Sequence, residues 1–219
     1  MDRASWDKRA PLSGALFAIL LAVSYFLLPS KAQPKGSDDG SKYLAYITGH
    51  HDALLWRGFV GSLAVVFFLW FIAAVGQRMR RLGEDRLAST AFGGGVVLAG
   101  IAIFQLSTVS WITWDHGGGL DGSVVKFVYQ GGTFAFSYAT AVFVGAASLS
   151  TLRTKMVPTW LSWYGLVLAV WLLVSGVAYK HSGFFSPTGW FGGLALVMFL
   201  IGTLMASVWM YTHPVGNEP

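Results

Sequence analysis

Six apolar segments, each of about twenty residues, confine the charged residues of this 219-residue chain to short connections. An α-helix of that length crosses the ~30 Å hydrocarbon layer of a bilayer. Because lipid cannot hydrogen-bond free backbone groups, such segments are expected to be helical. The predicted fold is therefore all-α, a polytopic helical bundle in which residues 1–219 form one transmembrane domain. The expected spans lie at 11–29, 54–76, 89–112, 127–149, 159–179 and 189–211.

The composition excludes several classes of protein. Charged residues make up 11% of the chain and hydrophobic residues 54%, whereas a typical soluble domain is about 25% charged. The chain has no cysteine, so disulfides and thiolate chemistry are excluded. No basic run is long enough to form a phosphate-binding face, and nucleic acid is not an expected partner. No His, Asp, Glu or Lys falls at the middle of a predicted span, so haem ligation or a proton relay there is not expected.

The basic residues indicate how the chain is oriented. Arginines gather between the second and third spans, at positions 78, 80, 81 and 86, and Arg153 and Lys155 follow the fourth span. The positive-inside rule places this side in the cytoplasm. The expectation is a multi-pass protein of the bacterial plasma membrane with both termini cytoplasmic. The segment 30–53 is then an outer loop, and its KYLAYITGHH portion favours a short interfacial helix.

Arg57 is the one charged residue inside a predicted span, near the outer end of 54–76. Such a charge is costly unless it meets an acceptor or extends to the headgroups. Asp115 ends the third span, on one helical stripe with Gln105 and Thr108. We therefore predict that Arg57 pairs with Asp115, with Gln105 and Thr108 beneath, in a polar ligand-binding pocket. The alternative is that Arg57 snorkels to the outer headgroups.

Histidines at the same outer side raise the question of a metal site. His50, His116 and His181, together with Asp115 or Asp52, form a candidate ligand set for zinc or copper. No HExxH motif accompanies them, and every candidate lies at the edge of a loop. A cofactor is therefore not expected, and metal binding stays the alternative. The serines lack a GxSxG motif, which leaves nucleophilic hydrolysis without specific support.

Several stretches carry a family resemblance: LAYITGHHDALLWRG, the basic loop after FLW, the AFGGG start of the third span, and PTWLSW at 158–163. With them, residues 12–211 resemble a family of six-span bacterial integral membrane proteins of unknown function, of the DUF4386-like type, common in high-GC Gram-positive bacteria. The resemblance implies the six-helix topology and the bacterial plasma membrane. It implies no activity, substrate or catalytic residue.

Three functions are compatible with these features. The first is a membrane protein whose outward-facing polar pocket binds a small molecule, a lipid headgroup or a partner protein. The second is an outward-facing membrane enzyme, with or without a metal ion, that acts on a lipid or another apolar substrate. The third is an accessory or scaffold subunit of a membrane complex. For the enzyme alternative, no motif assigns a catalytic residue.

Overall fold

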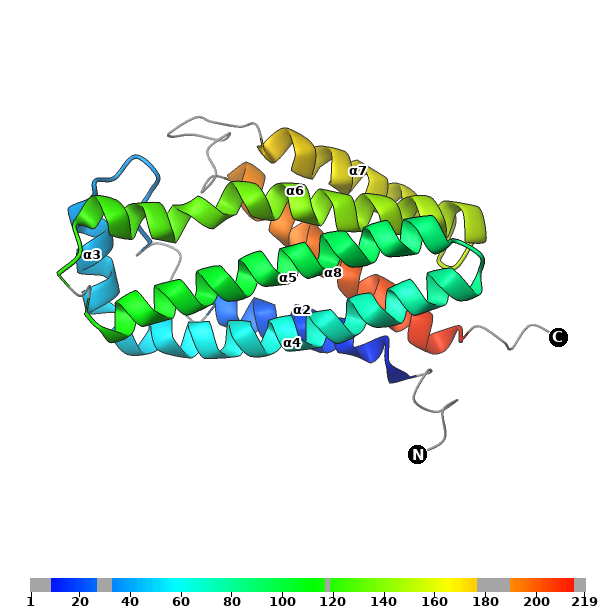
Figure 1. Cartoon of the computed structure of the whole chain (residues 1–219), viewed down its shortest axis with the longest axis horizontal. Coiled ribbons are helices and arrows are strands. Elements are labelled where there is room, and N and C mark those ends of the chain that lie inside the picture. Colours follow the sequence, from blue (N-terminus) through cyan, green and yellow to red (C-terminus); the bar gives the residue numbers. More distant parts are fainter. Residues whose placement is uncertain (1–8, 27–32, 117–118, 177–189, 215–219) are drawn as a thin grey trace.

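The computed structural model describes residues 9–26, 33–116, 119–176 and 190–214. All regular secondary structure in these ranges is helical, which confirms the all-α prediction. Long helices lie roughly side by side, and the short helix α3 lies across one end of them (Figure 1). The helices are α2 (Leu12–Phe26), α3 (Gly40–Gly49), α4 (His51–Arg81), α5 (Asp85–Trp114), α6 (Gly122–Thr154), α7 (Thr159–Gly176) and α8 (Trp190–Thr212).

Five of these helices, α4 to α8, are long and apolar enough to cross a membrane. Together they make the chain a helical membrane protein. The sixth apolar helix, α2, has 15 residues and is shorter than the span predicted at 11–29, part of which lies outside the described residues. Helices α4, α5 and α6 extend past the predicted spans at both ends, because the chain remains helical where charged residues replace apolar ones.

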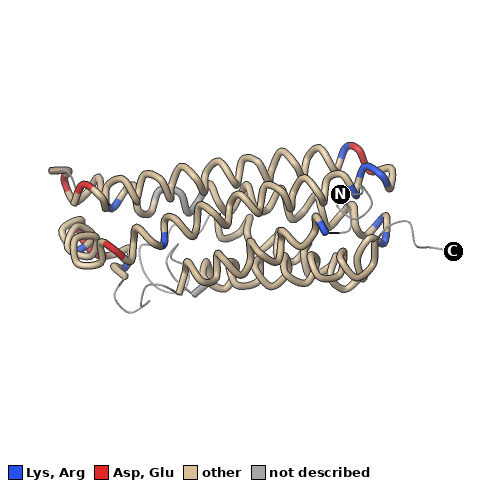
Figure 2. The backbone as a smooth tube through the Cα atoms, turned by 90° about the horizontal axis from the view of Figure 1, so that it is seen from below, with Lys and Arg blue, Asp and Glu red and all other residues tan. Residues whose placement is uncertain are grey.

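Charged residues collect at the two ends of the bundle and leave the middle of the helices uncharged (Figure 2). In the described part of the chain, the end that holds the α4–α5 connection carries seven Lys and Arg against two acidic residues. The α3 end carries four Lys and Arg against five acidic residues. We call these the basic end and the α3 end. This asymmetry is the one that the positive-inside rule associates with a cytoplasmic and an outer face.

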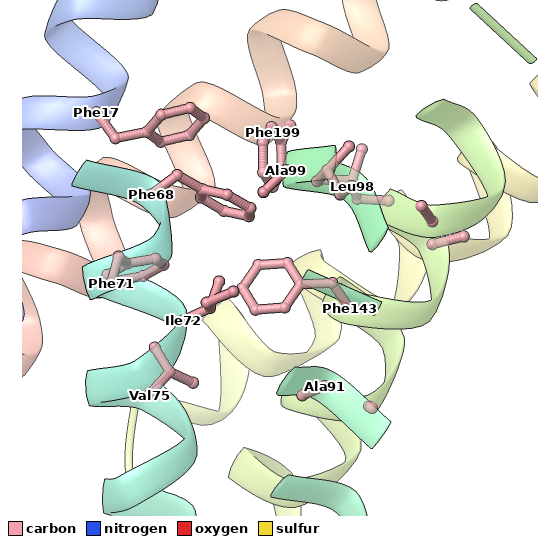
Figure 3. Close-up of a cluster of buried hydrophobic side chains, with 14 of the residues drawn as sticks. Phe17, Phe68, Phe71, Ile72, Val75, Ala91, Leu98, Ala99, Phe143 and Phe199 are labelled. Atoms are coloured by element: carbon pink, nitrogen blue, oxygen red, sulfur yellow. The ribbon is translucent and has the colours of Figure 1, made fainter. Parts of the chain in front are cut away.

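Phenylalanines from four helices form the centre of the core. Phe68 of α4 lies 4.7 Å from Phe17 of α2, 5.4 Å from Phe143 of α6 and 6.1 Å from Phe199 of α8, measured between ring centroids (Figure 3). Each of these rings is at most 7% exposed. Offset and edge-to-face contacts of this kind hold helices that are distant in sequence in one packed unit.

Small residues bring α4, α5 and α6 close together. A side chain on Gly94 of α5 would meet the backbone of Phe143 on α6, and one on Gly95 would meet Ile72 on α4. Close approach through glycine is the usual way that membrane helices gain packing contacts. The AFGGG segment is therefore a packing element at the point where α5 lies between its two neighbours.

Candidate functional site at the α3 end

Helix α3 covers the end of the bundle at which α4 and α6 begin. Its N-cap Asp39 accepts a hydrogen bond from the Lys42 amide. Its buried face places Tyr43, Tyr46 and Ile47 against Leu54 of α4 and Val125 of α6, in a small apolar cluster separate from the main core. This buried face anchors α3 across the bundle and fixes where its tyrosines lie.

Arg57 lies half-buried beneath this end of the bundle. Its Nη1 donates a long hydrogen bond of 3.4 Å to the Tyr129 hydroxyl of α6. Its guanidinium carbon lies 5.5 Å from the centre of the Tyr25 ring of α2, a cation–π distance. These two aromatic groups engage only part of a side chain that carries five N–H donors.

The predicted Arg57–Asp115 ion pair does not form. Arg57 has no ion pair with any carboxylate in the described part of the chain, and Asp115 is an exposed residue directly after α5. The reason is the rotation of α4. Gly58 and Gly61 face α5, where side chains on them would meet Ser110 and Leu106. Arg57 precedes Gly58, about 100° away around the helix, and so it is directed toward α2 and α6.

Gln105 and Arg57 both contact Tyr129 of α6. The Gln105 side-chain amide donates to the Tyr129 backbone oxygen at 2.9 Å, while the Tyr129 hydroxyl accepts from Arg57. Thr108 instead bonds within its own helix, to the Phe104 carbonyl oxygen at 2.7 Å. Of the stripe predicted on α5, Gln105 therefore contacts α6, and Thr108 makes no side-chain hydrogen bond to another described helix.

Tyr46 adds a buried polar atom to the site. The residue is 5% exposed, and its hydroxyl has no hydrogen-bond partner among the described residues. It lies near Tyr129 and Gln33 without a well-formed bond to either, and burial raises its pKa, so it stays a neutral donor. A buried hydroxyl without a partner costs free energy. We name Arg57, Tyr129, Tyr46 and Gln105 the Arg57 site.

The tyrosines were not predicted as site residues. Tyr43 and Tyr46 were recognised only as part of an expected helix, and Tyr129 was not singled out. Tyr43 is fully buried; it donates to the Lys35 carbonyl oxygen at 3.0 Å and accepts from Gln130. Burial raises the pKa of Tyr43 to about 12. The sequence feature that could have indicated these residues is the polar character of the predicted fourth span. Within it, Tyr129 contacts Arg57 and Gln130 contacts Tyr43.

The histidines are only partly brought together. The rings of His51 and His116 stack at 4.5 Å between centroids, and the His51 Nδ1 lies 2.8 Å from an Asp52 oxygen. His50 is turned away and bonds the Tyr46 carbonyl oxygen through Nδ1 at 3.0 Å. His181 lies outside the described residues. Within the described ranges, no group of three or more His, Asp or Glu is placed to hold a metal ion.

Acid is expected to loosen the start of α3. A hydrogen bond from Ser41, and then the Lys42 amide, lower the pKa of Asp39 from its ordinary 3.8. A depressed folded-state pKa means that the stabilisation is present above about pH 4 and is lost as pH falls through the folded value. Hydrogen exchange, corrected for intrinsic rate, should show weaker protection of the first turn of α3 near pH 2 than near pH 6. The Asp39→Asn variant caps without titrating and should change less. An equal change in both would contradict the prediction.

The fold and the site define the class of protein. It is a helical membrane protein in which a half-buried arginine, with hydrogen-bond donors left over, lies below a tyrosine-rich end of the bundle. Comparisons with family models, with curated proteins and with solved structures give no match to this chain.

Proposed function

We propose that this is a bacterial plasma-membrane protein that binds an anionic group, of a small molecule or a lipid headgroup, at the outer end of its bundle. Arg57 is the binding residue. The single observation that carries the proposal is a half-buried guanidinium that has two aromatic contacts and no described carboxylate partner. A charge in this position favours an anion that supplies the missing acceptors.

The neighbouring groups support the same ligand class. Among the described residues the buried Tyr46 hydroxyl has no hydrogen-bond acceptor. Burial raises the pKa of Tyr46, and the charge of Arg57 acts against that shift, which places the two groups near each other. Guanidinium and phenol donors together suit a phosphate or carboxylate. We place the basic end in the cytoplasm, following the positive-inside rule, so the Arg57 site lies at the outer end of the bundle.

Loss of the Arg57 charge should weaken anion binding about tenfold or more, because a charge-assisted hydrogen bond contributes about 1.5–3 kcal/mol. The test titrates the purified full chain in detergent with phosphatidylglycerol, phosphatidylcholine or inorganic phosphate, with bound species measured by native mass spectrometry. Wild type should prefer phosphatidylglycerol over phosphatidylcholine. Arg57→Gln should lose that preference, and Arg57→Lys should retain part of it, since lysine keeps the charge but not the planar fork.

Lys42→Gln is the matched control. Lys42 lies at the same end, is exposed, and already pairs with Asp38 at 2.8 Å. This variant makes the same change in charge and should bind as wild type does. Phosphate binding without a lipid preference would assign the site to a free anion. Equal weakening in Lys42→Gln and Arg57→Gln would reduce the effect to surface charge and overturn the proposal, as would unchanged binding in Arg57→Gln.

A further inference from the structure

A cavity lies in the other half of the molecule, toward the basic end. Its volume is about 90 Å³, and its walls come from α4, α6, α7 and α8. On α4 it is lined by Phe71 and Val75, of which Phe71 is 14 residues from Arg57, or about 21 Å along the helix. The cavity is therefore a separate place from the Arg57 site.

The lining is mostly apolar, with hydroxyl side chains at Ser148, Thr151, Tyr164 and Thr203. None of its described residues is charged, and most present only carbon atoms to the space. Two of its polar side chains already have partners within the protein. The Tyr164 hydroxyl donates to the Met198 carbonyl oxygen at 2.7 Å, and the Thr151 hydroxyl shares a 2.7 Å hydrogen bond with Ser162. A water molecule needs two to four polar partners to be held in a cavity. This surface suits an uncharged apolar ligand better than water.

Small residues line the cavity, and the large side chain of Tyr164 on α7 reaches α8 beside it. Gly165 lets α7 lie directly against Ser148 of α6. Tyr164, next to Gly165, reaches across to α8, where a side chain on Gly202 would come within 2.9 Å of its ring. The cavity walls beside Tyr164 also include Ala147 and Ala206. Protein interiors contain few voids larger than a water molecule, and a leucine at either alanine would fill much of this one.

We propose that this cavity binds an uncharged hydrocarbon group, either the end of a lipid acyl chain or a small free apolar molecule. Its volume is below the ~150 Å³ of an engineered apolar cavity that holds benzene. The occupant is therefore a short hydrocarbon group, and a drug-sized molecule would not fit. The walls supply dispersion contacts and no charge, so binding follows shape and apolar area.

Photolabelling of the full chain in lipid nanodiscs tests the proposal. One probe is phosphatidylcholine with a diazirine at the end of an acyl chain, and the other is a short free alkyl diazirine. Labelled residues are mapped by peptide mass spectrometry. Either probe is expected to label the cavity walls on α6, α7 and α8, and the probe that does so identifies the source of the ligand. Labelling of the exposed, lipid-facing Trp56 and Phe59 of α4 serves as the internal reference.

The cavity-filling variants Ala206→Leu and Ala147→Leu should each reduce labelling of the walls several-fold relative to that reference. The two alanines lie on different helices, α8 and α6, so one variant still tests the proposal if the other fails to fold. Val208→Leu is the matched control, because Val208 is exposed on the same helix as Ala206. Arg57→Gln should leave the labelling unchanged. Wall labelling that persists in both filling variants, or that neither probe produces in the wild type, would overturn the proposal.

Discussion

Replacement of Gly94 by leucine is expected to force α5 and α6 apart and to lower the free energy of unfolding by about 3 kcal/mol or more, at the upper end of overpacking effects. A Cβ at this position would lie 2.8 Å from the backbone nitrogen of Phe143 and 2.9 Å from a methyl group of Val142. A backbone atom cannot rotate away as a side chain can, so the helices themselves must shift. Reversible unfolding in mixed micelles, followed by circular dichroism, measures the loss.

The same segment supplies the control for this prediction. Gly93 is adjacent in sequence, yet nothing lies within 4 Å of the position that its Cβ would occupy. Gly93→Leu makes the same chemical change on the same turn of α5 and should alter the unfolding free energy by less than about 1 kcal/mol. If both variants were equally unstable, the effect would come from glycine's place in a helix and not from the contact with α6.

Replacement of Arg78 by methionine should release the end of α8 from α4. Arg78 is half-buried, and its guanidinium donates to the carbonyl oxygen of Met210 at 2.8 Å and to that of His213. Carbonyl groups in the last turn of a helix have no partner within the helix. A cation there is also attracted to the negative end of the helix dipole. Two charge-assisted bonds, one of them exposed, contribute about 3 kcal/mol.

Arg80→Met is the comparison for this prediction, because Arg80 is exposed and lies on the same last turns of α4. Arg78→Met should lower the midpoint of thermal unfolding and increase hydrogen exchange over 209–213, whereas Arg80→Met should change neither. Equal exchange at the end of α8 in the two variants would show that Arg78 does not hold it. Methionine keeps most of the apolar stem, so the comparison isolates the hydrogen bonds.

The pairing of helices explains why the residues of the site were predicted only in part. Gln105 and Arg57 contact the same residue, Tyr129, one at its backbone oxygen and the other at its hydroxyl. The predicted pairing with Asp115 depends on α4 and α5 being neighbours. They are indeed neighbours, but the face of α4 that meets α5 carries Gly58 and Gly61. Arg57 directly precedes Gly58 and therefore lies about 100° away from that face around the helix, so its charge is directed toward another helix.

The apolar segments and the distribution of arginines determined, without any coordinates, that this chain is a helical membrane protein with a basic end. Each is a local property, since hydropathy over twenty residues decides whether a segment can enter lipid. Only the tertiary structure decided that Arg57 meets tyrosines instead of Asp115, and that space remains beside Tyr164. The rotation of each helix about its axis depends on the side chains of all its neighbours at once, and no single segment encodes that sum.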